Sequence, residues 1–85
     1  MDTANPVLGL CQDGMRAEAE GRRADARKLF ERAWAAATDD YDACVAAHYL
    51  ARQQDHPEEV LRWNREALDR ADAVADGLHR LRDGH

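Results

Sequence analysis

Cys44 and His48 are the side chains of this sequence whose types and spacing best suit metal binding. They are four residues apart, so on a helix they would lie on one face, where a thiolate and an imidazole can both ligate zinc. A structural zinc site needs four ligands, and no further histidine, cysteine or acid stands at a suitable spacing. We therefore expect no metal ligands, no cofactor and a structural role for His48.

Other groups that carry catalysis are scarce. The sequence contains no serine, which excludes chemistry that depends on a serine nucleophile. No glycine-rich loop follows a strand-like segment, so a phosphate-binding loop has no support. The acid pairs Asp39-Asp40 and Glu58-Glu59 stand where helices are expected to begin, and there their charge favours the helix dipole without any catalytic role. The sequence thus predicts no catalytic residue and a protein that is not an enzyme.

Length and charge restrict the kinds of partner further. The 85 residues form a single domain, 1–85, whose small core leaves little room for a deep catalytic cavity. The net charge of -5 comes from interleaved acidic and basic groups, whereas a nucleic-acid-binding surface needs clustered lysine and arginine. No apolar run reaches the length of a membrane span or a signal-peptide core. We expect a cytoplasmic protein that binds neither nucleic acid nor a membrane, and the abundant alanine and arginine suggest a bacterial origin.

Helix start and stop signals divide the chain into four segments. Asn5-Pro6 offers a capping side chain followed by a proline at the first helical position, and Pro57 repeats this arrangement. Asp39 precedes the third segment, and Gly21 can end the first helix in a left-handed conformation. These signals predict helices near 6–20, 23–37, 40–54 and from 57 onward. Because the connections are short, successive helices should run antiparallel.

The last segment has an unbroken helical periodicity. Residues at spacings of four and three mark one face, namely Val60, Asn64, Ala67, Ala71, Val74, Leu78 and Leu81. Acid-then-base pairs at i,i+4, such as Glu66 with Arg70, support one helix from 57 to about 82. Gly77 weakens a helix by about 1 kcal/mol relative to alanine, so a bend or break near 72–77 stays open.

The chain also matches itself at an offset of 34 residues. Under this shift Ala26, Phe30 and Ala33 fall on residues of the last segment with the same spacing. The residues they meet are Val60, Asn64 and Ala67. Since the expected helix starts shift by nearly the same amount, the pattern indicates stacked helix-turn-helix units.

The first of these units resembles a tetratricopeptide repeat. In that family a small residue on the first helix packs beneath the second helix, whose alanine, aromatic residue and alanine follow at spacings of four and three. The corresponding residues here are Gly14, Gly21 at the turn, Ala26, Phe30 and Ala33. The resemblance implies two repeats, at about 7–40 and 41–74, and a capping helix at about 75–82.

The sequence departs from the family pattern at several positions. Leu10 stands where the first repeat would have tryptophan. In the second unit His48 replaces a small residue and Asn64 an aromatic one, with Trp63 one residue earlier able to supply the missing bulk. The expected fold class is all-α, with antiparallel helix-turn-helix repeats in four helices and a long or broken C-terminal helix. An ordinary four-helix bundle is the alternative.

The resemblance also implies a binding surface. In the family, the first helix of each repeat lines a concave face, and its exposed residues recur at about every fourth position. Carried over to this sequence, the partner-binding residues are Leu8, Cys11, Met15, Glu18, Asp42, Val45, Tyr49 and Arg52. Five of them are apolar or aromatic, and none supplies the lysine or asparagine of the family's clamp for a peptide carboxylate. An acidic C-terminal peptide is therefore not the expected ligand.

Three occupants of this face stay open, together with a second way in which two copies can pair. If a protein or peptide partner inserts a helix or extended segment, the chain is a non-catalytic adaptor or scaffold, which is the function we expect. If two copies bury the face on each other, the chain is a structural, self-associating homodimer with no separate ligand. The terminal helix can instead fold back and cover the apolar residues of this face itself. The terminal helices of two copies can also pair with each other, through the residues spaced from Val60 to Leu81.

Overall fold

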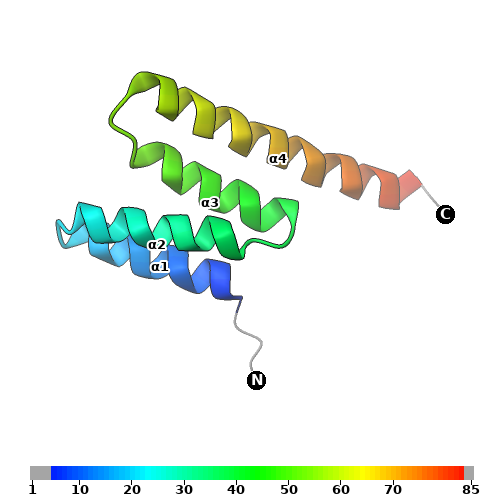
Figure 1. Ribbon diagram of the computed structural model, residues 1–85. Helices are drawn as coiled ribbons and strands as arrows, with labels where there is room; N and C mark the ends of the chain where they lie inside the picture. The colour runs from blue at the N-terminus through cyan, green and yellow to red at the C-terminus, as the bar shows by residue number, and fades with distance from the viewer. Residues whose placement is uncertain (1–4, 84–85) are drawn as a thin grey trace.

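The computed structural model describes residues 5–83, with side chains described as far as Gly77. This range holds four α-helices and no strand, so the expected all-α class is confirmed. The helices are α1 (Pro6–Ala19), α2 (Arg23–Ala36), α3 (Asp40–Arg52) and α4 (Pro57–Asp83) (Figure 1). All four begin at the residues that the capping signals predict.

The helices form two antiparallel pairs that stack on each other. α1 packs against α2 and α3 against α4, while α3 also contacts both helices of the first pair (Figure 1). α4 is one continuous helix of 27 residues. The break near 72–77, which the sequence allowed because of Gly77, does not occur. The segment expected at 75–82 as a separate capping helix is therefore a continuation of α4.

The first and third helices are joined at their starts by a polar contact. The Asn5 side-chain oxygen accepts a hydrogen bond from the Val7 N–H at 2.9 Å, which caps α1. The Nδ2 group of Asn5 donates to Asp42 Oδ1 at 3.1 Å. Asp42 is buried, and its own backbone N–H donates to the capping carboxylate of Asp39. One side chain thus caps α1 and satisfies a buried carboxylate on α3.

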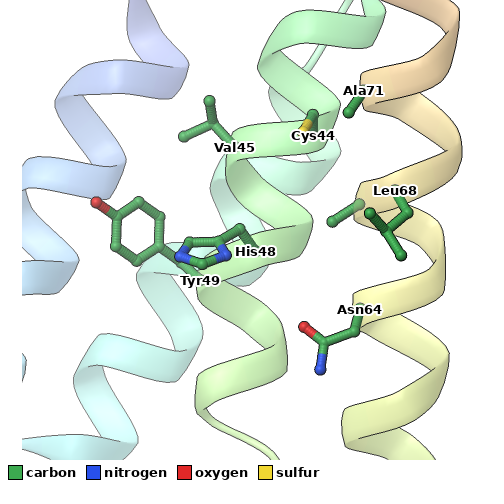
Figure 2. A pocket seen from close by; sticks show the side chains of 8 residues that line it. Cys44, Val45, His48, Tyr49, Asn64, Leu68 and Ala71 are labelled. Carbon is green, nitrogen blue, oxygen red and sulfur yellow. The ribbon is translucent and has the colours of Figure 1, made fainter.

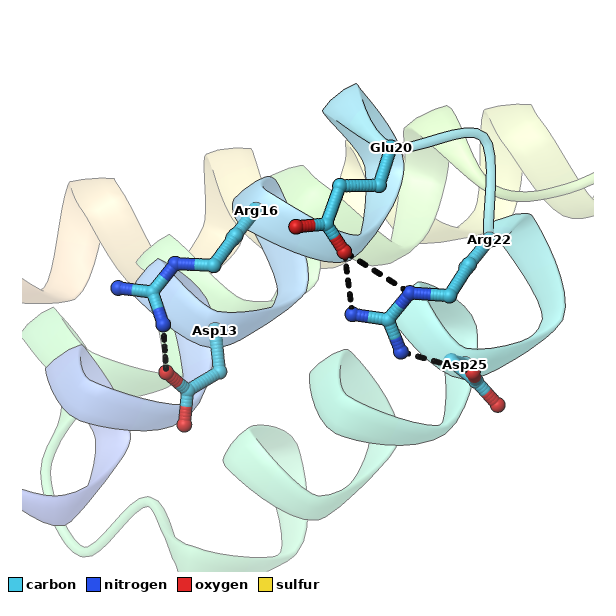
Figure 3. Close-up of polar contacts among 5 residues, drawn as sticks. All are labelled: Asp13, Arg16, Glu20, Arg22 and Asp25. Atoms are coloured by element: carbon cyan, nitrogen blue, oxygen red, sulfur yellow. Dashed lines mark hydrogen bonds and ion pairs between the residues drawn. The ribbon is translucent and has the colours of Figure 1, made fainter.

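The turn between α1 and α2 closes on a glycine. Gly21 has a φ of 80°, a left-handed conformation that glycine adopts without steric cost. The N–H of Arg22 then donates to the Ala17 carbonyl at 2.8 Å, as in a helix-ending motif. Figure 3 shows the Arg22 guanidinium between Glu20 and Asp25. By accepting its hydrogen bonds, these carboxylates raise the pKa of Arg22 above its ordinary value.

Phe30 occupies the centre of the core and depends on Gly14. The ring is fully buried, and a Cβ added at Gly14 would approach its Cδ1 atom to 2.8 Å. Ala26 and Ala33, one turn to either side, are also fully buried. Small residues therefore let α1 and α2 approach closely, and the aromatic ring fills the space between them.

Gly14→Ala should destabilise the protein by about 1–3 kcal/mol, because the added methyl group overlaps the Phe30 ring. The matched control is Gly9→Ala on the same helix, where nothing lies within 4 Å of the new Cβ. This control should gain about 0.5–1 kcal/mol from helix propensity. Urea unfolding followed by circular dichroism measures both, and a stabilised Gly14→Ala protein would contradict the packing described.

Asn5→Ala should cost about 1–3 kcal/mol of unfolding free energy, because it removes the helix cap and leaves the Asp42 carboxylate without that partner. Asn5→Ser retains a capping oxygen but not the amide donor, so its loss should be intermediate. Chemical denaturation of the original protein and the two variants gives their unfolding free energies. The difference between the variants separates the helix cap from the contact with Asp42. A serine variant as stable as the original would show that the contact with Asp42 contributes nothing.

Candidate protein-binding groove

An open groove of about 560 Å³ runs between α3 and α4. Figure 2 shows Cys44 of α3 and Asn64 and Ala71 of α4 between the two helices, whereas Val45 and Tyr49 extend from α3 on the side away from α4. The lining residues are Cys44, Val45, His48 and Tyr49 from α3, and Asn64, Ala67, Leu68 and Ala71 from α4. Most of these side chains are apolar, and Leu68 is 66% exposed. A cluster of this kind, left in contact with water, is typical of a surface that another molecule covers.

The groove exists because the second helix pair lacks the central aromatic residue of the first. Phe30 stacks on Tyr49 with ring centroids 4.9 Å apart, and this contact fills the space above α1 and α2. At the corresponding place 34 residues later stands Asn64, a small polar side chain that is exposed. Trp63, expected to supply the missing bulk, packs edge-on against Trp34 of α2 instead, at 5.0 Å. The space between α3 and α4 is therefore left open.

Four of the eight predicted binding residues join α1 to α3. The Tyr49 hydroxyl donates to the Met15 sulfur at 3.1 Å, and Arg52 pairs with Glu18 at 2.9 Å. In both pairs the two residues are 34 positions apart in the sequence. Residues that correspond under the sequence offset are therefore also in contact in the structure. Glu18 accepts a second hydrogen bond from the buried side chain of Gln53. Tyr49 and Arg52 of α3 are thus engaged with Met15 and Glu18 of α1.

Two of the predicted residues are buried, so the exposure expected for them is wrong. Cys11 is only 2% exposed and Asp42 only 6%. Cys11 belongs to the core cluster that includes Ala46 and Leu50 of α3, and Asp42 of α3 accepts the hydrogen bond from Asn5 at the start of α1. Burial, and then the charge of Asp42, raise the pKa of the Cys11 thiol above its ordinary value.

The remaining predicted residues divide between the groove and the outer surface. Val45 and Tyr49 line the groove on its α3 wall. Leu8 is 40% exposed near the start of α1 and is not among the groove residues. The groove therefore shares two residues with the face predicted from the resemblance, and it lies one helix further along the stack.

Six groove residues were absent from the predicted set, although the offset of 34 points to them. They are Cys44, His48, Asn64, Ala67, Leu68 and Ala71. Subtracting 34 gives Leu10, Gly14, Phe30, Ala33, Trp34 and Ala37, which belong to the first pair's core or pack against it. The groove is thus the second copy of a surface that is covered in the first copy.

The described residues hold no group of three histidine, cysteine or acidic side chains placed to bind a metal ion. Cys44 and His48 do share the groove, but no third ligand joins them there among these residues. No helix in the described range is long and apolar enough to cross a membrane. Comparison with models of known protein families, with curated protein sequences and with solved structures gives no significant match.

Iodoacetamide should modify Cys44 well before Cys11 in the folded protein at low concentration. Cys44 is partly exposed on the groove wall, whereas Cys11 is buried and its raised pKa makes the reactive thiolate scarce. Mass spectrometry of digested samples taken over time gives both rates. In denaturant the two rates should become equal, and equal rates in the native protein would contradict the burial of Cys11.

Proposed function

We propose that this protein is a non-catalytic interaction module that binds an amphipathic helix of a protein partner in the groove between α3 and α4. The observation that carries this proposal is the open, largely apolar lining of the groove, with Leu68 and Ala71 exposed on one wall. An apolar groove between two helices suits the apolar face of a third helix, which satisfies its own backbone hydrogen bonds.

The first helix pair supplies a template for this binding mode. α3 lies on the surface of α1 and α2 that corresponds to the groove, and it buries Ala43, Ala46 and Leu50. These residues follow at spacings of three and four, so they form one face of the helix. The ligand expected for the groove is therefore a helix with small residues and a leucine at similar spacing.

Polar side chains at the groove would set the position of such a helix. Asn64 of α4 and His48 of α3 both line the groove and can exchange hydrogen bonds with polar groups beside the ligand's apolar face. The Tyr49 ring is held by stacking on Phe30 and by the guanidinium of Arg52, 5.6 Å from its centroid. The α3 wall is thus ordered before a ligand arrives, which lowers the entropy cost of binding.

A fluorescent peptide with the sequence of residues 40–53 tests this function, because α3 is the helix that covers the corresponding surface. Its fluorescence anisotropy should rise in a saturable way as the protein is added. Leu68→Glu should weaken binding at least tenfold, since it places a carboxylate in the apolar lining. Because Leu68 is largely exposed, the stability of the fold should change by less than about 0.5 kcal/mol.

The matched control is Ala73→Glu, which adds the same charge to an exposed position of α4 outside the groove lining. Peptide affinity should be unchanged by this substitution. A peptide that binds both variants equally well, or that does not bind the original protein in its monomeric form, would refute the groove as a helix-binding site. The cytoplasmic location expected from the sequence stays a prediction.

A further inference from the structure

α4 carries an uncovered stripe along the edge of the groove. Its residues alternate at spacings of three and four, the pattern of two helices packed along their length. They are Leu61, Asn64, Leu68, Ala71 and Ala75, and all five are exposed. Leu61 and Leu68, at 60% and 66%, are the most exposed large apolar side chains of the described residues. The stripe is thus a helix-packing surface without a helix on it.

The same surface on α2 shows what covers it. Residues 34 positions earlier than the first four members of the stripe are Arg27, Phe30, Trp34 and Ala37. Phe30 stacks on Tyr49 of α3, and Arg27 donates a hydrogen bond to Gln54 just beyond the end of α3. The helix on this side of α2 therefore runs antiparallel to it (Figure 1). A helix on the stripe of α4 should have the same orientation.

α4 extends beyond the other helices that the structure describes. It has 27 residues against 13 in α3, so about half of its length runs past the start of α3 (Figure 1). A free helical segment of this size is marginally stable in water without packing. This half of α4 begins with alanines at 71 and 75 on the stripe, and the face of α3 that fills the first groove also carries small residues, Ala43 and Ala46. The chain thus contains both a groove that fits a helix and a helical segment that lacks a packing partner among the described helices.

We propose that the occupant of the groove is α4 of a second copy of this chain, packed antiparallel in a two-fold symmetric dimer. This inference rests on the proposed function, because it names the helix that the groove binds. With the two-fold axis between residues 69 and 70, Leu68 lies opposite Ala71 of the second copy. Asn64 then lies opposite Ala75 of the second copy. At both of these positions a larger residue faces an alanine, which allows close approach of the two helices.

Charge selects this register. Arg65 and Asp72 flank the stripe on one side, are exposed, and form no ion pair with other residues that the structure describes. In the proposed dimer each Arg65 lies beside Asp72 of the other copy, giving two symmetric ion pairs. Sliding by one heptad in either direction would bring two arginines or two aspartates together. Such like-charge contacts disfavour the neighbouring registers.

The decisive experiment exchanges these charges. Analytical ultracentrifugation of a dilution series should show a dimer for the original protein. Asp72→Arg gives each copy two arginines along this edge, and Arg65→Asp gives each copy two aspartates. Either variant alone should dimerise about tenfold more weakly or worse, because two attractive pairs become repulsive. An equimolar mixture of the two should regain the dimer, since every contact then joins opposite charges.

The matched control is Asp69→Arg, which makes the same charge change on the face of α4 away from the stripe. It should leave the dimer unchanged. Recovery in the mixture separates an interfacial role from a loss of folding, because a variant that fails to fold cannot be restored by mixing. Circular dichroism of each variant provides the independent check on helix content.

The outcomes distinguish the dimer from the groove. A protein that is monomeric throughout the series, but binds the 40–53 peptide in a manner that depends on Leu68, overturns the dimer and leaves the groove to an unrelated helix. A dimer that ignores both charge exchanges overturns this packing. If the protein neither dimerises nor binds the peptide, both proposals fail.

Discussion

The close contact of α1 with α2 through Gly14 and Phe30 is the constraint on which the rest of the structure depends. A methyl group at Gly14 would overlap the ring, so the two helices lie as near as their backbones allow. The other face of the ring then stacks on Tyr49, which fixes the place of α3 above the first pair. One buried aromatic side chain therefore joins three of the four helices and sets the stacking direction.

The second helix pair has the same backbone plan without that central contact. His48 and Asn64 stand where the first pair has Gly14 and Phe30, and both are exposed at the groove. The large aromatic residue of the second pair is Trp63, which packs edge-on against Trp34 of the first pair. This contact stabilises the packing of the two pairs on each other. Arg70 adds to this junction through Asp40, at 2.9 Å. The exposed end of the stack is thus firmly held yet incompletely filled.

Helix boundaries were predictable from the sequence because their signals are local. Asn5 with Pro6 and the left-handed Gly21 act within one turn, so no knowledge of tertiary packing was needed. The burial of Cys11 and Asp42 was not predictable in the same way. Helical spacing identifies the face on which a residue lies, but the depth of a helix crossing depends on side chains from both partners. Comparing each position with its counterpart 34 residues away would have identified the groove residues.

The offset of 34 residues links the fold to the proposed association. A stack of similar helix pairs buries one face of each pair against the next, and the groove is a face of the second pair that no described residue covers. In this chain that face has kept its apolar residues, whereas a terminal face that only meets water would be expected to carry polar ones. Leu68 and Ala71 are more readily explained as contacts that another helix completes. The extension of α4 past α3 places such a helix within the same molecule, but its own groove lies alongside it, and a helix cannot pack against itself. In the proposed dimer a second copy supplies this helix and covers the apolar lining of each groove.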